Sequence, residues 1–259
     1  MGLLEVEGVK KRYGGIQALD GCHLSVGRGE IAGLIGPNGS GKTTLFNVIT
    51  GYEKVRQGTV HLDGDEITNL LPDKIFNRGV GRTFQLTRVF GRLSVMENML
   101  VASQHRRSWW ATSWHRAGSH GERRRADGLL EFVGIARHAE ERAENLSYGQ
   151  RKLLELAYVL MSDPEVVLLD EPAGGVNPTL LNVISDHIRA LNEQGRTFLV
   201  VEHNMEFVMG LCHRVAVMDH GSIVVSGRPE QVRNDPRVLD AYLGTADDED
   251  DDEGDGFPG

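Results

Sequence analysis

The stretch GPNGSGKTT, residues 36–44, decides the fold of this chain. It fits the pattern G-x-x-x-x-G-K-[ST], and it lies between an apolar run, IAGLIG at residues 31–36, and a helical segment that begins near Lys42. Glycines let successive backbone N–H groups point inward without Cβ clashes, and a helix amino terminus adds partial positive charge. The sequence therefore predicts a strand, a phosphate-binding loop and a helix in succession. The alternative, a chance glycine turn, leaves the agreement of all three unexplained.

The side chains of this loop suit a nucleoside triphosphate. Lys42 is expected to reach the β and γ phosphates, and the Thr43 hydroxyl is expected to bind Mg²⁺, whose charge offsets that of the triphosphate. The predicted nucleotide-binding residues of the loop are Gly36, Pro37, Asn38, Gly39, Ser40, Gly41, Lys42, Thr43 and Thr44.

A second apolar run, VVLLDEP at residues 166–172, supplies two carboxylates. Asp170, at the end of the predicted strand, is expected to hold Mg²⁺ directly or through a water molecule. Glu171 follows it and is expected to act as the general base that receives a proton from the attacking water. The alternative is that the two acids merely end a strand.

The order of the apolar segments predicts an α/β domain. Alternating segments near the front, LLEVEGV, CHLSV and TVHLDG, indicate an antiparallel β portion. Continuous apolar strands then alternate with helical stretches, which is typical of a buried parallel sheet. Helical periodicity replaces the strand signals in between and predicts a helical subdomain over about residues 88–162. We expect one domain over residues 1–245.

The charge is concentrated at the carboxyl end. The net charge is −9, but residues 247–255 hold eight of the 37 acidic side chains, and the remaining 29 nearly balance the 28 basic ones. A run of like charges cannot bury itself, so residues 246–259 are expected to form a disordered acidic tail. An interaction tail and a salt adaptation are the alternatives. A nearly neutral body makes nucleic acid an unexpected partner.

Cysteine content and hydropathy indicate the compartment. The two cysteines, Cys22 and Cys212, have no metal-like spacing, and the first residues contain no long apolar segment. We therefore expect the protein to reside in the reducing cytoplasm. No window reaches 18 consecutive apolar residues, so a role in transport would require another polypeptide to form the pore.

Together these features resemble the ATP-binding cassette (ABC) family, over about residues 4–244. The most diagnostic piece is LSYGQ at residues 146–150, which stands where the family has LSGGQ. The resemblance implies a phosphate-loop NTPase with a RecA-like α/β core, an antiparallel β subdomain and a helical subdomain. It also implies ATP and Mg²⁺ as cofactors and catalytic roles for Lys42 and Glu171.

In the family two cassettes meet head to tail, and the signature of one closes over the ATP held by the other. The resemblance therefore implies that Ser147, Gly149 and Gln150 contact the nucleotide of a second ABC subunit. A helix amino terminus at Ser147 offers free N–H groups to a phosphate, although a plain N-cap is the alternative. Tyr148 replaces the central glycine of the signature, so the loop is less permissive there.

Four further positions match family elements one at a time. Tyr13 matches the aromatic residue that stacks on adenine, and Gln85 matches the glutamine that touches Mg²⁺ or water. His203, 32 residues after Glu171, matches the histidine that contacts the γ-phosphate. Asn177 stands where many cassettes have an aspartate that couples the subunits. The alternatives are a packed tyrosine, an exposed glutamine and a structural histidine.

Three blocks together look most like the ATPase subunits of branched-chain (hydrophobic) amino-acid importers. They are GVNP, the stretch from RTFQ to MENML, and VRNDPRVLDAYLG. The implied partners are a second cassette, transmembrane permeases and, indirectly, an extracytoplasmic solute-binding protein, with this chain peripheral at the cytoplasmic face of the plasma membrane. The alternatives are a urea or amide importer, a lipopolysaccharide-type exporter and a soluble cassette of DNA repair or translation.

The segment RRSWWATSWHRAGSHGERRR, residues 106–125, gathers all three tryptophans among many arginines. Two glycines and the lack of an apolar stripe argue against a regular amphipathic helix. We interpret it as a variable loop, with contact to a membrane-embedded partner as the main alternative. Nucleic acid binding is the least expected.

Overall fold

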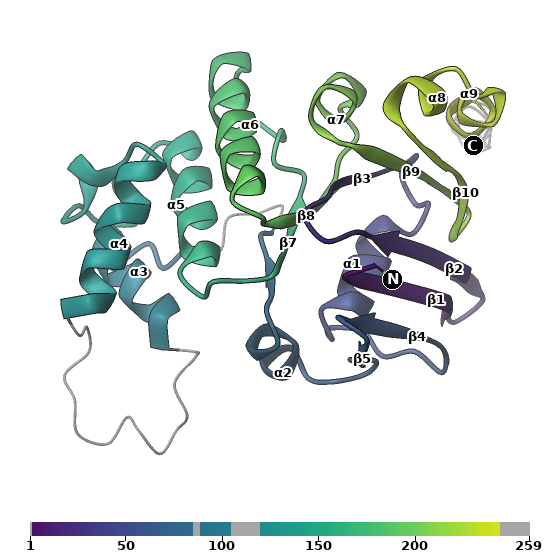
Figure 1. Cartoon of the computed structure of the whole chain (residues 1–259), viewed down its shortest axis with the longest axis horizontal. Coiled ribbons are helices and arrows are strands. Elements are labelled where there is room, and N and C mark those ends of the chain that lie inside the picture. The colour runs from purple at the N-terminus through teal and green to yellow at the C-terminus, as the bar shows by residue number, and fades with distance from the viewer. Residues whose placement is uncertain (1, 85–88, 105–119, 244–259) are drawn as a thin grey trace, which may run out of the picture. The chain divides into compact units, whose positions relative to one another are not determined.

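The computed structural model describes residues 2–84, 89–104 and 120–243 (Figure 1). The chain forms two compact units. The first contains the described parts of Met1–Val26, Ile31–Asn69 and Val201–Gly259, and the second those of Gly27–Glu30 and Leu70–Val200. Three predicted features lie outside the described residues, namely Gln85, residues 106–119 of the tryptophan- and arginine-rich segment, and the acidic tail.

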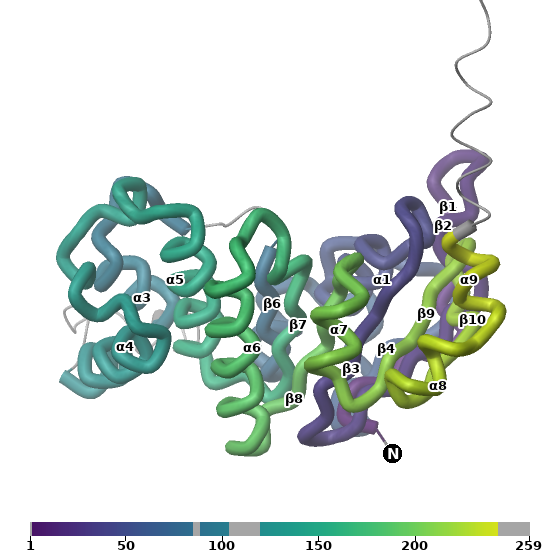
Figure 2. The backbone as a smooth tube through the Cα atoms, turned by 90° about the horizontal axis from the view of Figure 1, so that it is seen from above, coloured from purple at the N-terminus to yellow at the C-terminus, as the bar shows by residue number. Residues whose placement is uncertain are grey.

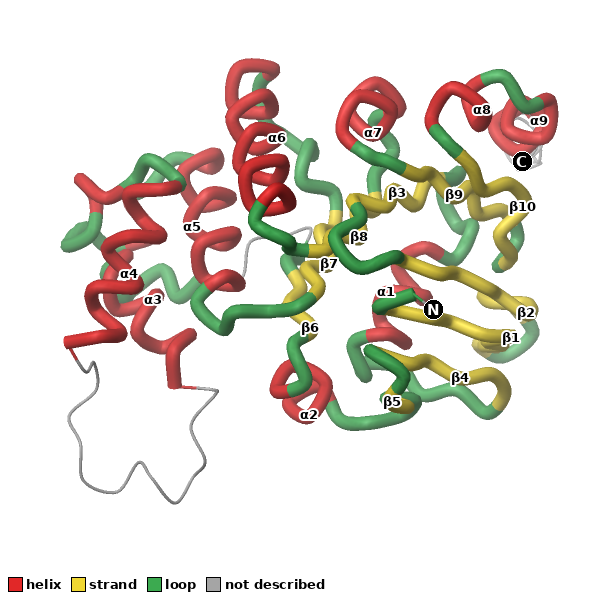
Figure 3. Tube along the Cα trace, in the orientation of Figure 1, coloured by secondary structure: helices red, strands yellow, loops and turns green. Residues whose placement is uncertain are grey.

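An antiparallel sheet belongs to the first unit, and Figure 3 shows its strands in yellow. Its members are β1 (Leu4–Tyr13), β2 (Ile16–Val26), β4 (Gln57–Leu62) and β5 (Asp65–Glu66), in the order β2-β1-β4-β5. Leu4 and Val6 of β1 are buried, because alternate side chains of a strand share a face. A register shift between Val6 and Val9, where Gly8 has a φ of +58°, returns Val9 to the buried face.

The first unit also contains three strands of a mixed sheet. Strand β3 (Ile31–Ile35) pairs in parallel with β9 (Arg214–Asp219), which pairs antiparallel with β10 (Ser222–Gly227). All five residues of β3 are buried. The helices of this unit are α1 (Lys42–Ile49), α7 (Met205–Leu211), α8 (Pro229–Arg233) and α9 (Pro236–Leu243). A Cβ on Gly33 would lie 2.6 Å from Cγ1 of Val208, so glycine lets α7 pack closely on β3.

Parallel strands and helices make up the second unit. Strand β6 (Val80–Arg82) pairs in parallel with β7 (Val166–Asp170), and β8 (Thr197–Val201) is the other neighbour of β7. Its helices are α2 (Pro72–Asn77), α3 (Val95–Gln104), α4 (His120–Phe132), α5 (Tyr148–Leu160) and α6 (Pro178–Glu193). A Cβ on Gly81 would lie 2.6 Å from Cγ1 of Val159, so α5 approaches β6 closely.

Helices α3, α4 and α5 contact one another, and Figure 2 shows them grouped together. Their shared core contains Met99, Ala126, Leu130 and Leu154, all with no exposed surface. The described residues between 89 and 162 include no strand, only an isolated bridge between Ser94 and Arg142. Helical periodicity predicted a helical region here. It did not predict that the last residues of the tryptophan- and arginine-rich segment belong to α4, which begins at residue 120.

The predicted α/β class with a separate antiparallel sheet is confirmed. Elements α2, α7, β5 and β6 were not individually predicted, because strands of two or three residues and helices of six or seven carry little periodicity. Helix α6 was not individually predicted either, although it has 16 residues. Within the described part of the chain, no helix combines the length and apolar character needed to span a bilayer.

Both cysteines are expected to be protected in the folded protein. Cys22 has no exposed surface, and burial raises the pKa of its thiol to about 12, while Cys212 is 6% exposed. Only a thiolate attacks a disulfide reagent, so at pH 8 the native protein should react roughly 100-fold more slowly than the protein in urea. Absorbance during reaction with a chromogenic disulfide checks this, and release of two thiols within minutes without urea would contradict the fold.

Candidate functional site

The phosphate loop is shaped by neighbouring backbone. It follows β3, and α1 begins at Lys42 with Gly41 as its N-cap in a left-handed conformation. A Cβ on Gly36 would lie 2.1 Å from the carbonyl oxygen of Met218, and one on Gly41 would lie 2.5 Å from that of Ala18. Since real Cβ atoms do not approach a carbonyl so closely, both positions require glycine.

Lys42 lies inside this loop. Its side chain is buried, and its ammonium donates to the carbonyls of Gly36 and Pro37, at 2.8 and 2.7 Å, and to Oγ of Ser40 at 3.4 Å. Charge and donors are therefore placed where the sequence predicted phosphate contacts. The side chain of Thr43 is exposed, as its predicted role as a metal ligand requires.

The predicted adenine-stacking residue lies beside this loop. Tyr13 ends β1, is 42% exposed, and has the Lys11 ammonium 4.9 Å from its ring centroid. Burial of part of its surface and the nearby Glu53 carboxylate raise the pKa of the Tyr13 hydroxyl, and the Thr44 side chain interacts with that hydroxyl. The ring is thus accessible and adjacent to the loop's last residue.

His203 is held through its backbone. Its N–H group and that of Asn204 donate to Oε2 of Glu202, at 3.1 and 3.3 Å. Glu202 is fully buried, and its own N–H donates to the carbonyl of Leu34 in β3, the strand that leads into the phosphate loop. The imidazole itself is 63% exposed, so the anchor fixes the chain while leaving the ring accessible.

In the second unit, Asp170 forms a buried ion pair. Its Oδ2 accepts from Nη2 of Arg82 at 2.9 Å, and the two side chains are only 8% and 7% exposed. The N–H of Asp170 also donates to Oγ1 of Thr83 at 3.2 Å. These contacts fasten the end of β7 to the residues at and after the end of β6. The negative charge of Asp170, which is surrounded by protein, is compensated by the positive charge of Arg82.

Glu171 has a strained backbone. Its φ is +48°, a left-handed conformation that costs a residue with a Cβ about 1–2 kcal/mol. Its carbonyl accepts two hydrogen bonds of 3.0 Å, from Nζ of Lys152 and from the N–H of Gly174. Strain of this kind persists only where the surrounding structure holds it.

The signature forms a capping box at the start of α5. Oγ of Ser147 accepts from the N–H of Gln150 at 3.2 Å, and Oε1 of Gln150 accepts from the N–H of Ser147 at 2.8 Å. Ser147 is exposed. A Cβ on Gly149 would lie 2.3 Å from Cδ2 of Leu180, so glycine lets the Leu180 side chain pack closely against this position. Ser147 thus caps a helix and also faces outward.

Tyr148, the departure from the LSGGQ pattern, packs against the chain that follows Glu171. Its hydroxyl donates to the carbonyl of Gly174 at 3.1 Å. A Cβ on Gly175, whose φ is +69°, would lie 3.1 Å from the tyrosine ring. The bulky residue is accommodated because the facing position is a glycine.

Asn177 caps the next helix. Its Oδ1 accepts from the N–H of Leu180 at 2.9 Å, and Pro178 occupies the first position of α6. The sequence analysis gave Asn177 only a role between subunits. The signal for the cap was the asparagine–proline pair, since asparagine favours the N-cap and proline the first turn.

The candidate residues therefore lie in two groups. The first unit brings together Tyr13, the phosphate loop and the strand anchor of His203. The second unit contains Asp170 and Glu171 in sequence and joins them to the signature through α5. Gln85 lies outside the described residues, one position after Phe84.

Comparison with known proteins decides the family. The model of the ABC transporter family matches residues 19–174, and that of the branched-chain amino acid ATP-binding cassette transporter matches residues 222–248. The chain is also 41% identical over 253 residues to the high-affinity branched-chain amino acid transport ATP-binding protein LivG of Escherichia coli (strain K12). The match covers 94% of this chain and 98% of that protein.

The chain belongs to the ABC transporter family. Within it, the chain is an ATP-binding protein of the branched-chain amino acid transporter subfamily, an ATPase that hydrolyses ATP to drive transport. The predicted family and activity are confirmed, and the non-transport alternatives are not supported.

Solved structures agree on the cassette fold. The crystal structure of an ATP-binding cassette of an ABC transporter in its ADP conformation is 35% identical, with a TM-score of 0.84 over 94% of this chain and 99% of that one. A bacterial ABC transporter cassette solved as a dimer is 25% identical, with a TM-score of 0.77 over 87% of this chain and 98% of that one.

Each unit of the cassette carries an oxygen donor of the kind that a magnesium ion takes. Mg²⁺ prefers oxygen ligands and usually takes only one or two from protein, the rest coming from phosphate and water. The hydroxyl of Thr43 and the carboxylate of Asp170 are such donors. No cluster of three or more His, Cys, Asp or Glu side chains suited to a metal occurs among the described residues, so side chains alone build no closed metal cage there.

Besides Glu202, three buried charged residues of the described chain were not identified from the sequence. They are Arg82, Lys152 and Glu155, which are attached to Asp170, Glu171 and Phe84 respectively. For Glu155 a signal existed, because this carboxylate interrupts the apolar run LLELA at residues 153–157, which indicates a buried polar residue on a helix. Arg82 had no such signal, because its partner is 88 residues away.

Replacing Arg82 should destabilise the cassette strongly. In Arg82→Met the Asp170 carboxylate stays buried without its guanidinium, so we expect a loss of about 3 kcal/mol in the free energy of unfolding. Arg123→Met is the matched control, since Arg123 pairs with Glu140 at an exposed site of the same unit and should change stability by less than about 1 kcal/mol. Urea unfolding measures both, and equal losses would contradict the assignment.

Proposed function

We propose that this cassette is the Mg²⁺-dependent ATPase subunit of an importer for branched-chain amino acids. The observation that carries the proposal is similarity, over nearly the full length of both chains, to LivG, the high-affinity branched-chain amino acid transport ATP-binding protein of Escherichia coli. The match of residues 222–248 to the branched-chain cassette model supports the same substrate class. The subunit works at the cytoplasmic face of the membrane with permease partners and, indirectly, a solute-binding protein.

The residues that bind ATP and the residues that promote its hydrolysis have distinct roles. The amides of residues 36–44 and the Lys42 ammonium hold the phosphates of ATP and stabilise the charge that develops on the γ-phosphate. Thr43 and Asp170 hold Mg²⁺, which neutralises phosphate charge, and Tyr13 stacks on adenine. Glu171 orients the attacking water and receives its proton on the carboxylate. Gln85 and His203 contact the γ-phosphate region.

A second cassette subunit completes each site. The exposed Ser147 at the start of α5 presents a hydroxyl and the dipole of a 13-residue helix to an incoming phosphate, and with Gly149 and Gln150 it contacts the ATP of the partner. The dimer seen in the bacterial relative supports this arrangement. Both identical and different cassettes satisfy it.

Glu171→Gln should separate binding from hydrolysis. Glutamine retains the shape of glutamate but accepts no proton, so we expect turnover to fall at least 100-fold, roughly the worth of a general base, while ATP-dependent dimers accumulate. Gel filtration with ATP and phosphate release measure the two effects. Glu165→Gln is the matched control, because Glu165 forms an exposed ion pair with Arg28. Unchanged turnover in Glu171→Gln would exclude this role.

The transported solute is tested in the complete complex. The cassette should be purified with its native permeases and reconstituted in vesicles with the cognate solute-binding protein. Leucine, isoleucine and valine should then stimulate ATP hydrolysis and accumulate inside, whereas urea and short amides should not. Stimulation by urea alone would reject the amino-acid assignment while leaving the ATPase intact.

A further inference from the structure

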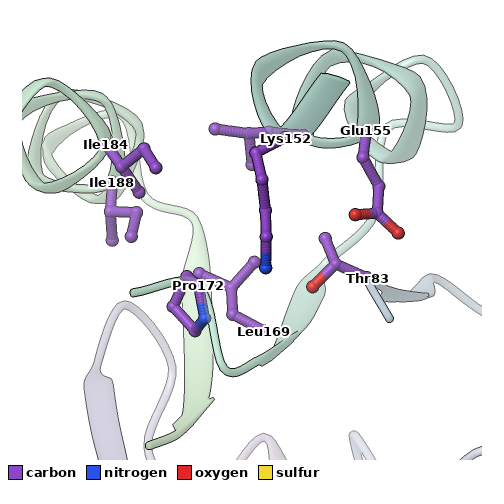
Figure 4. A pocket seen from close by; sticks show the side chains of 8 residues that line it. Thr83, Lys152, Glu155, Leu169, Pro172, Ile184 and Ile188 are labelled. Carbon is purple, nitrogen blue, oxygen red and sulfur yellow. The ribbon is translucent and has the colours of Figure 1, made fainter. Parts of the chain in front are cut away.

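A buried lysine next to the catalytic carboxylates has no task in the mechanism above. Lys152 lies on α5 and is 8% exposed. Figure 4 shows its side chain extending from the helix toward Leu169 and Pro172, among the residues of a small pocket. The pocket measures about 20 Å³, which is room for a single water molecule and excludes a nucleotide or an amino acid. The ammonium therefore serves the protein rather than a ligand.

The partner of this ammonium is the backbone of the proposed general base. Nζ of Lys152 donates to the carbonyl of Glu171 at 3.0 Å, and the N–H of Gly174 donates to the same oxygen. A hydrogen bond from an ammonium is stronger than one between neutral groups, and a site shielded from water strengthens it further. Glu171 is the residue with a φ of +48°, so the bond acts on the backbone that carries the strain.

Helix α5 also contacts the other end of the loop that begins at Glu171. We call residues 171–175 the Glu171 loop. Tyr148, one turn before Lys152, donates its hydroxyl to the carbonyl of Gly174, and its ring fills the space that a Cβ on Gly175 would take. The ammonium of Lys152 lies 5.8 Å from the centroid of the Tyr148 ring. Two side chains one turn apart on α5 thus hold the loop at both ends.

We propose that Lys152, with Tyr148, is a positioning residue that holds Glu171 in its left-handed conformation and ties it to α5. This inference rests on the proposed function, in which Glu171 is the general base. Fixing the carbonyl of Glu171 restrains its backbone, and this narrows the positions that its carboxylate can reach. Because Ser147 is the N-cap of α5, this one helix connects the signature to the backbone of the proposed base.

The first test is a pair of substitutions in the full chain. Lys152→Met keeps the length of the stem but removes the donor, and kcat for ATP should fall roughly 10- to 100-fold because the base is displaced. The KM for ATP should change less than about 3-fold, since the phosphate loop is untouched. Lys152→Arg should recover most of the loss. A kcat within about 2-fold of the wild type in Lys152→Met, or no recovery in Lys152→Arg, overturns the proposal.

The second test separates this proposal from the role of Glu171. In the Glu171→Gln background there is no base to position, so adding Lys152→Met should leave the residual turnover unchanged. A further fall as large as in the wild type would mean that Lys152 acts through another group and would overturn the proposal alone. Full turnover in Glu171→Gln would instead reject the proposed role of Glu171 as general base.

The third test does not depend on hydrolysis. Without nucleotide, hydrogen exchange of the Gly174 amide, which bonds to Glu171, should accelerate about 10-fold or more in Lys152→Met and in Tyr148→Phe. Tyr158→Phe is the matched control, since it removes a hydroxyl from the same helix away from the Glu171 loop. Mass spectrometry of peptides covering residues 171–175 gives the rates. Equal rates in Tyr148→Phe and Tyr158→Phe overturn the proposal, even if Lys152→Met does not fold.

Discussion

The close approach of neighbouring backbone to the phosphate loop is the constraint on which this structure depends. The carbonyls of Met218 and Ala18 leave no space for a Cβ at Gly36 and Gly41, so these carbonyls and the loop can coexist only with glycine. The two carbonyls come from β9 and β2, which lie in different sheets of the first unit. The shape of the phosphate loop therefore depends on the positions of strands β2 and β9.

In the second unit, the main constraint is that several charged side chains are buried and need compensating partners. Asp170 is compensated by Arg82, and the buried Lys152 and Glu155 bond to backbone groups at Glu171 and Phe84. Each buried charge therefore fastens a segment that carries or precedes a predicted catalytic residue. Charges that cost free energy to bury are retained here because they set the geometry of the loops around them.

The sequence predicted the parts of the site that are local. The strand, glycine loop and helix around Lys42 are contiguous, and Asp170 and Glu171 end an apolar strand, so periodicity and residue type located them. The pair of Arg82 with Asp170 was beyond such reasoning, because only the pairing of β6 with β7 brings the two residues together. The left-handed turn at Glu171 was equally hidden, since nothing in a glutamate indicates positive φ.

The hydrogen bonds of Lys42 have a kinetic consequence for the cycle. Its ammonium donates to two carbonyls and a hydroxyl of its own loop. A phosphate can take over these donors one at a time, and each donor has a protein acceptor to return to. Departure of the anion therefore does not leave this buried ammonium without acceptors, so product release avoids the cost of an unsatisfied buried charge.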